Sequence, residues 1–301
     1  MIFNPETFKQ AVKELELETL YNKTDRVCGD GDIDNYLVAE TVNDAWEYWY
    51  AALTAQAWDS EKVAESRDGA VAAEILNAIT VIKNPTRMIV NSKARKMPMR
   101  YAVGELLWYL SGSNKLRDIQ YFSSAWDRMS DDGETVNSCY GHKIQSFYGF
   151  DQWQDVIERL TQDPNSRQAV IHIKNPRAIT DPTKDTPCTL SLQFLIRNNR
   201  LNLTVTMRSN DVWTGVPYDM FSFCSMQVMM AMRLGVEVGT YVHQAASLHL
   251  YERNAPQKPE NPIKAKKRSS SKPQEENHEK STPEVSQGQA GVLQEDSAQN
   301  N

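Results

Sequence analysis

A cysteine at position 188 stands between a polar loop and a strand-like run, in the stretch DTPCTLSLQF. An arginine-ended strand follows it by a hairpin, and an arginine beside a thiol lowers the thiol pKa and favours the nucleophilic thiolate. A lone cysteine at a strand start is also a common small buried hydrophobe. The stretch therefore leaves two interpretations open, a nucleophile and a packing residue.

Glu105 lies inside an apolar segment, GELLWYL. A buried carboxylate is costly unless it is paired, hydrogen-bonded or protonated. Burial would raise its pKa and suit it to relay protons, whereas an outward-facing position on a half-exposed helix would give it no special chemistry. Spacing alone does not separate these two interpretations.

Three arginines lie at loop or strand ends beside a serine or an aspartate: Arg67 in SRDG, Arg167 in NSRQ and Arg208 in MRSND. A single surface arginine is usually an ion-pair partner. Three of them in short polar turns of an acidic chain can instead converge on a phosphate, which arginine binds through two parallel hydrogen bonds. Ser209 would add a hydroxyl donor.

The elements that must position these residues follow from hydrophobic periodicity. Helices are expected over 5–20, 35–58, 101–112 (closed by Gly112), 153–163 and 218–234. Strands are expected over 167–174, 188–197, 200–208 and 241–251, with a hairpin turn at RNNR, 197–200. This order predicts an α+β fold in which helices cover a mixed or antiparallel sheet.

Composition excludes several classes of protein. The chain of 301 residues is 40% hydrophobic, enough for a substantial core, and its net charge of −6 argues against a general nucleic-acid binder. The four cysteines form no C-x-x-C pair, no histidine cluster has zinc spacing, and no glycine pattern for triphosphates or dinucleotides occurs. With no signal peptide and no membrane-length apolar run, a metal-free protein of a reducing cytosol is expected.

The last part of the chain differs from the rest. From 255 to 301 there is no Phe, Trp or Tyr, while Pro, Ser, Gln, Glu and Lys abound. Such a segment buries too little apolar surface to offset the entropy of ordering, so a disordered tail is expected. The predicted division is an N-terminal helical segment over 1–60, a catalytic domain over 61–254 and the tail over 255–301.

Several stretches together resemble the family of thymidylate synthases and pyrimidine hydroxymethylases. They occur in the family's order and rough spacing between about 61 and 254: GELLWYLSG, SAWDRM, YGHKI, DPNSRQAVI, TPCTLSLQF, MRSNDVWTGVPYD and SLHLY. The resemblance implies the family's single-domain α+β fold and a homodimer. It also implies a pyrimidine nucleoside monophosphate as substrate and 5,10-methylenetetrahydrofolate as co-substrate.

The resemblance also implies roles by position. The catalytic residues would be the C6 nucleophile Cys188, the proton-relaying carboxylate Glu105 and Tyr140, near the step that removes a proton. The nucleotide would be held by Arg67, Arg167 (donated across a dimer interface), Gln168, Arg208, Ser209, Asp219, His249 and Tyr251. The folate side would include Trp126, Asp211 and Gly215.

Asp219 departs from the family pattern, because thymidylate synthases have asparagine after Gly-x-Pro-aromatic. An amide can donate to uracil O4 and accept from N3–H, whereas an ionised carboxylate only accepts. Asp219 is therefore interpreted as a cytosine selector that accepts from the 4-amino group, and from N3 once that nitrogen is protonated. This resembles the deoxycytidylate hydroxymethylases. A helix N-cap is the other interpretation.

Further departures bear on the phosphate site and on the product. Gln168 stands where a second arginine is usual, which weakens or rearranges phosphate binding, and Thr189 follows the nucleophile where histidine is common. The segment after Tyr251 lacks the family's closing pattern, and without closure water can add to the exocyclic methylene. The resemblance thus implies conversion of dCMP to 5-hydroxymethyl-dCMP. A thymidylate synthase, a dCMP methylase and a non-catalytic nucleotide-binding protein remain alternatives.

Overall fold

The computed structural model describes residues 5–17, 35–58, 64–65, 69–179 and 183–258. All of these residues except Lys258 belong to one compact unit. The helices are α1 (Pro5–Glu14), α3 (Val42–Trp58), α4 (Met99–Ser111), α5 (Leu116–Gln120), α6 (Tyr140–Gln145), α7 (Gln152–Gln162) and α8 (Val216–Leu234). The strands are β1 (Tyr36–Ala39), β2 (Ala64–Glu65), β3 (Val71–Ile82), β4 (Val170–His172), β5 (Thr189–Arg197), β6 (Arg200–Met207), β7 (Asn210–Asp211) and β8 (Glu237–Tyr251). Arg67 and the predicted tail from 259 onward lie outside the described residues.

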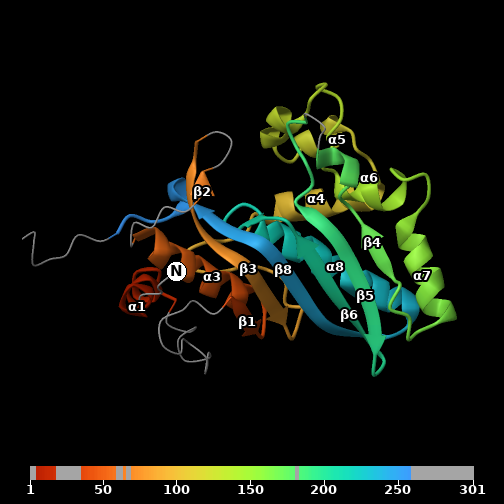
Figure 1. Cartoon of the computed structure of the whole chain (residues 1–301), viewed down its shortest axis with the longest axis horizontal. Coiled ribbons are helices and arrows are strands. Elements are labelled where there is room, and N and C mark those ends of the chain that lie inside the picture. Colours follow the sequence, from red (N-terminus) through yellow and green to blue (C-terminus); the bar gives the residue numbers. More distant parts are fainter. Residues whose placement is uncertain (1–4, 18–34, 59–63, 66–68, 180–182, 259–301) are drawn as a thin grey trace, which may run out of the picture. The chain divides into compact units, whose positions relative to one another are not determined.

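The strands form one mixed sheet in the order β1-β3-β8-β6-β5-β4 (Figure 1), with β2 paired to β3 and β7 paired to β8. β8 is antiparallel to β3 and parallel to β6, and the β4–β5–β6 side is antiparallel throughout. The predicted α+β class with a mixed sheet is confirmed. The long strand β8 joins the N-terminal part of the sheet to its C-terminal part.

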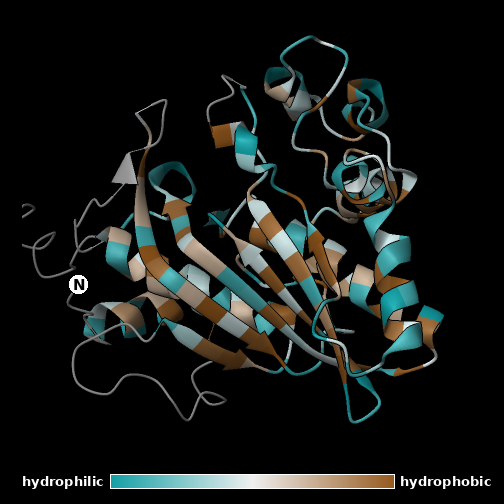
Figure 2. Ribbon diagram, turned by 45° about the vertical axis from the view of Figure 1, so that its right-hand side comes forward, coloured by the Kyte–Doolittle hydropathy of each residue, from teal (hydrophilic) through white to brown (hydrophobic). Residues whose placement is uncertain are grey.

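Helices α3 and α8 pack against one face of this sheet, as Figure 1 shows. Buried and half-buried residues alternate along β6, and Figure 2 shows a matching alternation of hydropathy along the strands. Alternation of this kind is typical of a sheet with one face in the core. The side chains on the other face are only half-buried in the single chain. Among the described residues, no helix is both long and apolar enough to cross a membrane.

Local signals placed several elements correctly. The helix expected over 101–112 is α4, and Gly112 closes it with φ of 66°, a left-handed conformation that glycine adopts without strain. The long apolar helix is α8. The RNNR turn joins β5 to β6, and Asn198 and Asn199 both have positive φ, 51° and 57°, as a tight hairpin turn requires.

Two parts of the N-terminal region differ from expectation. Residues 36–39, expected to be helical, form β1, because alternate side chains there are buried and the strand pairs in parallel with β3. The long strand β3 was not expected from the sequence at all. Residues 36–58 thus supply a strand and a buried helix to the same compact unit as the rest of the described chain.

Candidate active site

The strand pairing places Cys188 beside Arg208. Thr189 of β5 lies opposite Met207 of β6, so the residues just outside the two strand ends are neighbours. The Arg208 N–H donates to the Cys188 carbonyl over 2.8 Å, and the guanidinium Nη2 lies 3.5 Å from Cys188 Sγ. Ser209 Oγ lies 3.8 Å from the same sulfur. The half-buried thiol therefore has a cation and a hydroxyl as neighbours.

The Arg208 side chain is fixed by the loop that precedes the thiol. Its Nε donates to the Pro187 carbonyl over 3.1 Å and its Nη2 donates to the Thr186 carbonyl over 3.0 Å. Its Nη1 donates to Ser209 Oγ over 3.1 Å. The guanidinium is thus oriented before any ligand arrives, which lowers the entropy cost of binding an anion.

The pKa of Cys188 is raised above its usual value, mainly because burial disfavours the thiolate. Arg208 lowers this pKa and Asp219 raises it further, each by less than burial does. The expectation of a lowered thiol pKa is therefore wrong for the free protein, although Arg208 acts in the expected direction. The resting group is a thiol, and it needs a base or a bound ligand to become the nucleophile.

Glu105 points into the protein and not outward. Its side chain is 6% exposed, and burial raises its pKa to about 7. Tyr101 Oη donates to Glu105 Oε1 over 2.8 Å, and Trp126 Nε1 donates to Tyr101 Oη over 3.1 Å. Hydrogen bonds from Tyr101 and Tyr109 lower the Glu105 pKa and partly offset burial. A carboxyl that titrates near neutrality can both accept and return a proton, which is the chemistry of a relay.

Asp219 lies in the first turns of α8, whose N-cap is Gly215, so the N-cap interpretation of Asp219 is wrong. Burial raises the Asp219 pKa well above its usual value, and the Glu105 carboxyl raises it further. A hydrogen bond from Asn210 works in the opposite direction. Burial and the Glu105 carboxyl thus favour the protonated form of Asp219 over the anionic carboxylate expected from the sequence. A neutral carboxyl donates one hydrogen bond and accepts others.

Tyr140 begins α6 and joins the same cluster. Its ring stacks between Tyr109 and Phe223, with centroid separations of 5.1 and 5.8 Å. Burial raises its pKa well above the usual value, and the Asp219 and Cys188 groups raise it further. The hydroxyl therefore stays protonated at neutral pH and lies within electrostatic reach of both groups. The structure thus brings Cys188, Arg208, Ser209, Glu105, Tyr140 and Asp219 together.

His249 and Tyr251 lie on the same side of β8, two residues apart. Their rings meet edge to face with centroids 5.1 Å apart, and both side chains are half-buried. His249 pairs with Asp211 of β7, which directly follows the Arg208–Ser209 pair. The β7–β8 pairing therefore brings His249 next to the segment that carries Arg208.

Asp211 and Gly215 stabilise the turn that precedes α8. The Asp211 carboxylate accepts from the N–H groups of Trp213 and Thr214 over 2.7 and 3.2 Å, and from Thr214 Oγ1 over 2.7 Å. A side chain at position 215 would collide with Asn210 Oδ1. Both residues therefore shape the approach to Asp219, whatever else they bind.

Arg167 and Gln168 lie apart from the thiol within one chain. Both are exposed, and His172 of the following strand β4 lies opposite Ser191 of β5. The Gln193 side chain donates to the Arg167 carbonyl over 3.1 Å, and the five residues from Cys188 to Gln193 span about 17 Å at about 3.3 Å per strand residue.

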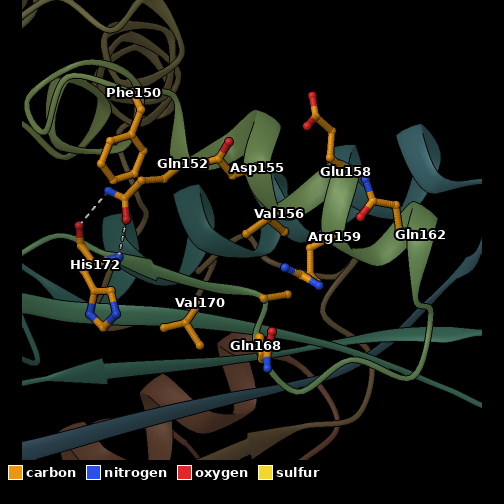
Figure 3. A pocket seen from close by; sticks show the side chains of 11 residues that line it. Phe150, Gln152, Asp155, Val156, Glu158, Arg159, Gln162, Gln168, Val170 and His172 are labelled. Atoms are coloured by element: carbon orange, nitrogen blue, oxygen red, sulfur yellow. Dashed lines mark hydrogen bonds between the residues drawn. The ribbon is translucent and has the colours of Figure 1, made fainter.

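Gln168 lines a different pocket, of about 440 Å³, between α7 and β4. Figure 3 shows Gln152 of α7 reaching the main chain of His172 there. Its Nε2 donates to the His172 carbonyl over 2.9 Å, and its Oε1 accepts from the His172 N–H over 2.8 Å. The amide thereby satisfies both main-chain groups of His172 at the free edge of β4. No residue of the thiol cluster lines this pocket.

Sequence reasoning missed Tyr101, Asn210, Tyr241 and His243. Tyr101 precedes Glu105 by one helical turn, and that i,i+4 spacing was a usable signal. Asn210, in the RSND stretch, and His243 of β8 gave no separate signal, because the contact between them depends on the tertiary fold. Among the described residues, no group of three or more His, Cys, Asp and Glu could hold a metal ion.

A thiol, a fixed cation, the buried carboxyl of Glu105 and the half-buried carboxyl of Asp219 form the site of a nucleophilic, acid–base enzyme. The family model described as thymidylate synthase matches residues 48–285, and the chain belongs to this family. It is 36% identical over 191 residues to a "Deoxyuridylate hydroxymethyltransferase" of Bacillus phage SP01, a match covering 59% of this chain and 50% of the relative. The chain thus spans about half the length of that curated relative.

A solved structure supports the same fold. The crystal structure of thymidylate synthase from T4 phage superposes with a TM-score of 0.57, covering 72% of this chain and 79% of that one. The two sequences are 21% identical, so this likeness concerns the fold.

Proposed function

We propose that this protein transfers a one-carbon unit from 5,10-methylenetetrahydrofolate to C5 of a pyrimidine nucleoside monophosphate, with dCMP as substrate and 5-hydroxymethyl-dCMP as product. The observation that carries the base assignment is the Asp219 carboxyl, close enough to raise the pKa of the Cys188 thiol. Membership of the thymidylate synthase family and the name of the phage SP01 relative support one-carbon chemistry and a hydroxymethyl product.

The protonation state of Asp219 gives it a role in nucleophilic attack. When the Cys188 sulfur adds to C6 of cytosine, electron density moves through the ring to N3. A neutral Asp219 donates its proton to N3 and accepts a hydrogen bond from the 4-amino group, so the developing charge is neutralised where it forms. The Cys188 thiol first releases its proton to solvent, and Arg208 and the Ser209 hydroxyl, 3.5 and 3.8 Å from the sulfur, favour the resulting thiolate.

Glu105 and Tyr140 are placed to move the C5 proton. Glu105, with a pKa of about 7, accepts a proton through water and returns it without leaving the neutral pH range. Tyr140 keeps its own proton and holds the relay water by hydrogen bonding. The Tyr101–Trp126 pair fixes the Glu105 carboxyl in one orientation.

The aromatic residues near α8 suit a flat co-substrate. The Arg95 guanidinium lies 4.4 Å from the ring centroid of Trp213, and its Nε is buried without a hydrogen-bond partner among the described residues. Trp126 and Tyr218 are half-buried nearby and offer ring surface. Trp126, Trp213, Tyr218 and Arg95 would hold the folate, which supplies the one-carbon unit when bound.

The same neutral acid also supports a second candidate substrate, dUMP. It can donate to uracil O4 and accept from N3–H, as an asparagine does. The phage SP01 relative carries deoxyuridylate in its name. Base choice therefore depends on whether Asp219 gives up its proton to the ring, which only cytosine N3 can accept.

We further propose that two copies assemble through the half-buried face of the sheet. That face carries polar and apolar side chains that are only half-buried among the described residues. Arg167, exposed and distant from its own Cys188 along the sheet, would then reach the phosphate held by Arg208 in the second copy. We assign the catalytic chemistry to residues 61–254.

The test is to incubate dCMP, CMP and dUMP separately with purified protein and methylenetetrahydrofolate, and to identify the products by mass spectrometry. We expect 5-hydroxymethyl-dCMP without accumulation of dihydrofolate, since dihydrofolate forms only when the folate gives up hydride. Stoichiometric dihydrofolate would contradict the hydroxymethyl product. Turnover of dUMP without dCMP would contradict the base assignment. Failure to release tritium from any 5-tritiated substrate would favour a non-catalytic binding protein.

A further inference from the structure

The loop that precedes Cys188 is joined to the start of α6 through Asp185. Asn137 Nδ2 donates to the Asp185 carbonyl over 3.0 Å, and the Ser138 hydroxyl donates to Asp185 Oδ2. Both donors stand just before Tyr140, the first residue of α6. We call Asn137, Ser138 and Asp185 the loop clamp.

The residues that follow the clamp orient Arg208. Thr186 and Pro187 come directly after Asp185, and their two carbonyls accept hydrogen bonds from the Arg208 guanidinium. Cys188 comes next, and its sulfur lies 3.5 Å from Arg208 Nη2. Because only two residues separate Asp185 from Cys188, the clamp fixes both the thiol and its neighbouring cation relative to α6.

Lys143 of α6 fixes the orientation of the Asn137 amide. Its side chain is 4% exposed, and its Nζ lies 3.3 Å from Asn137 Oδ1 and 3.3 Å from the ring centroid of Phe147. Burial lowers the Lys143 pKa to about 8, so the side chain still carries its charge at pH 7. An ammonium group only donates, so the amide atom that faces it is the oxygen. The Asn137 nitrogen is thereby directed at the Asp185 carbonyl.

We propose that Asn137 is a positioning residue for the Cys188–Arg208 pair: by holding the loop before the thiol, it keeps the guanidinium beside the sulfur. This inference rests on the proposed function, because it takes Cys188 as the nucleophile. Without the Asn137 donor, the two loop carbonyls that hold the guanidinium lose their fixed place. Arg208 should then stabilise the thiolate less and bind an anionic ligand at a higher entropy cost.

The charged and titratable groups that face the Cys188 thiol come from its own loop and from three other parts of the chain. They are Asp185 of the loop, Arg208 after β6, Asp219 of α8 and Tyr140 of α6. Arg208 is the cation among these four, and it lowers the thiol pKa, whereas the two carboxyl groups raise it. A less firmly held guanidinium should therefore raise the thiol pKa and slow alkylation of Cys188 at a given pH.

The experiment compares Asn137→Ala, Lys143→Met and the control Ser146→Ala. The control removes a hydroxyl that contacts His142 after the end of α6, and it leaves the clamp intact. We measure the rate at which iodoacetamide alkylates Cys188 as a function of pH, by mass spectrometry of the peptide that carries this residue. We also measure kcat and KM for dCMP and the melting temperature of each variant.

We expect alkylation of Cys188 at pH 7 to slow about fivefold in Asn137→Ala, which corresponds to the loss of one hydrogen bond. The pH profile of alkylation should move to higher pH, and kcat/KM for dCMP should fall by a similar factor. Lys143→Met should show the same changes at smaller size without a lower melting temperature, since it removes a buried charge. Ser146→Ala should show none of these changes.

Alkylation needs no nucleotide, so two different failures are distinguishable. If folded Asn137→Ala alkylates Cys188 at the wild-type rate and with the wild-type pH profile, whatever its melting temperature, the positioning role is overturned. Lys143→Met carries this test in its place if Asn137→Ala does not fold. If alkylation slows as expected while the wild type converts no pyrimidine nucleotide, the positioning role stands and the proposed function is overturned.

Discussion

The two carboxyls of the site come from different helices, and different neighbours act on their raised pKa values. Glu105 on α4 receives hydrogen bonds from two tyrosines, and its pKa is raised only to about 7. Asp219 on α8 receives one from Asn210, also faces the Glu105 carboxyl, and is held well above its usual pKa. Burial acts on both, so the number of donors and the neighbouring charge separate them. Glu105, with a pKa of about 7, can exchange protons at neutral pH, while burial and the Glu105 carboxyl bias Asp219 towards its protonated, hydrogen-bond-donating form.

The largest loss of turnover is expected when the Cys188 thiol is removed. Cys188→Ala should reduce turnover at least about 10⁴-fold, since no other thiol adjoins Arg208 among the described residues. Nucleotide binding, measured by calorimetry, should persist. Turnover within tenfold of the wild type would show that the cluster around Cys188, Glu105 and Asp219 is not the active site.

Replacing the neutral acid should change which base is used. Asp219→Asn keeps one donor and one acceptor but has no proton to give to cytosine N3. We expect the dCMP-to-dUMP ratio of kcat/KM to shift towards dUMP by about 10²-fold or more. Competition assays on an equimolar mixture measure the ratio directly. Glu105→Gln is the matched control, and it should slow both substrates with little change in their ratio.

The raised pKa of Glu105 should make the free energy of unfolding depend on pH. The pKa of Glu105 in the folded protein is about 7, against 4.5 for the free side chain. The folded state therefore holds this proton more tightly, and its stabilising contribution is complete below pH 4.5 and lost as the pH rises towards 7. Relative to Glu105→Gln, the wild type should lose about 3 kcal/mol of unfolding free energy across this window. Urea denaturation at several pH values measures it, and parallel curves would contradict the raised pKa.

The smallest expected effect comes from a substitution that keeps both carboxyls and alters only the pKa of Glu105. Tyr101→Phe deletes the hydroxyl that donates to Glu105 over 2.8 Å. Because that bond lowers the Glu105 pKa, its loss should move the acidic limb of the pH–rate profile upward by up to about one unit. Melting temperatures provide the control for general damage. A limb that stays in place would mean that Tyr101 does not govern Glu105.

Much of the C-terminal half could be predicted because its signals are local. The period-two alternation of β6, the RNNR turn and the apolar run of α8 each depend on neighbouring residues. β3 escaped prediction for a physical reason: Asn77 has φ of 56°, and the pairing with β8 skips it. That irregularity shifts the phase of burial along the strand and hides the alternation by which strands are recognised.

The sequence allowed us to predict which residues form the candidate site. It did not allow us to predict their pKa values. Motif resemblance picked out Cys188, Glu105 and Asp219, and the fold brings them together. The raised pKa values of the Cys188 thiol and the Asp219 carboxyl depend on how much water tertiary packing removes, which no local pattern records. The hydrogen bond between Asn210 and His243 likewise exists only because β7 and β8 meet.

The most direct test of the role of Asp219 is a single competition experiment. Equimolar dCMP and dUMP are mixed with the wild-type protein and methylenetetrahydrofolate, and early products are identified by mass spectrometry. We expect 5-hydroxymethyl-dCMP to dominate, because only cytosine offers a ring nitrogen that takes the Asp219 proton. Predominance of 5-hydroxymethyl-dUMP or dTMP would contradict the account.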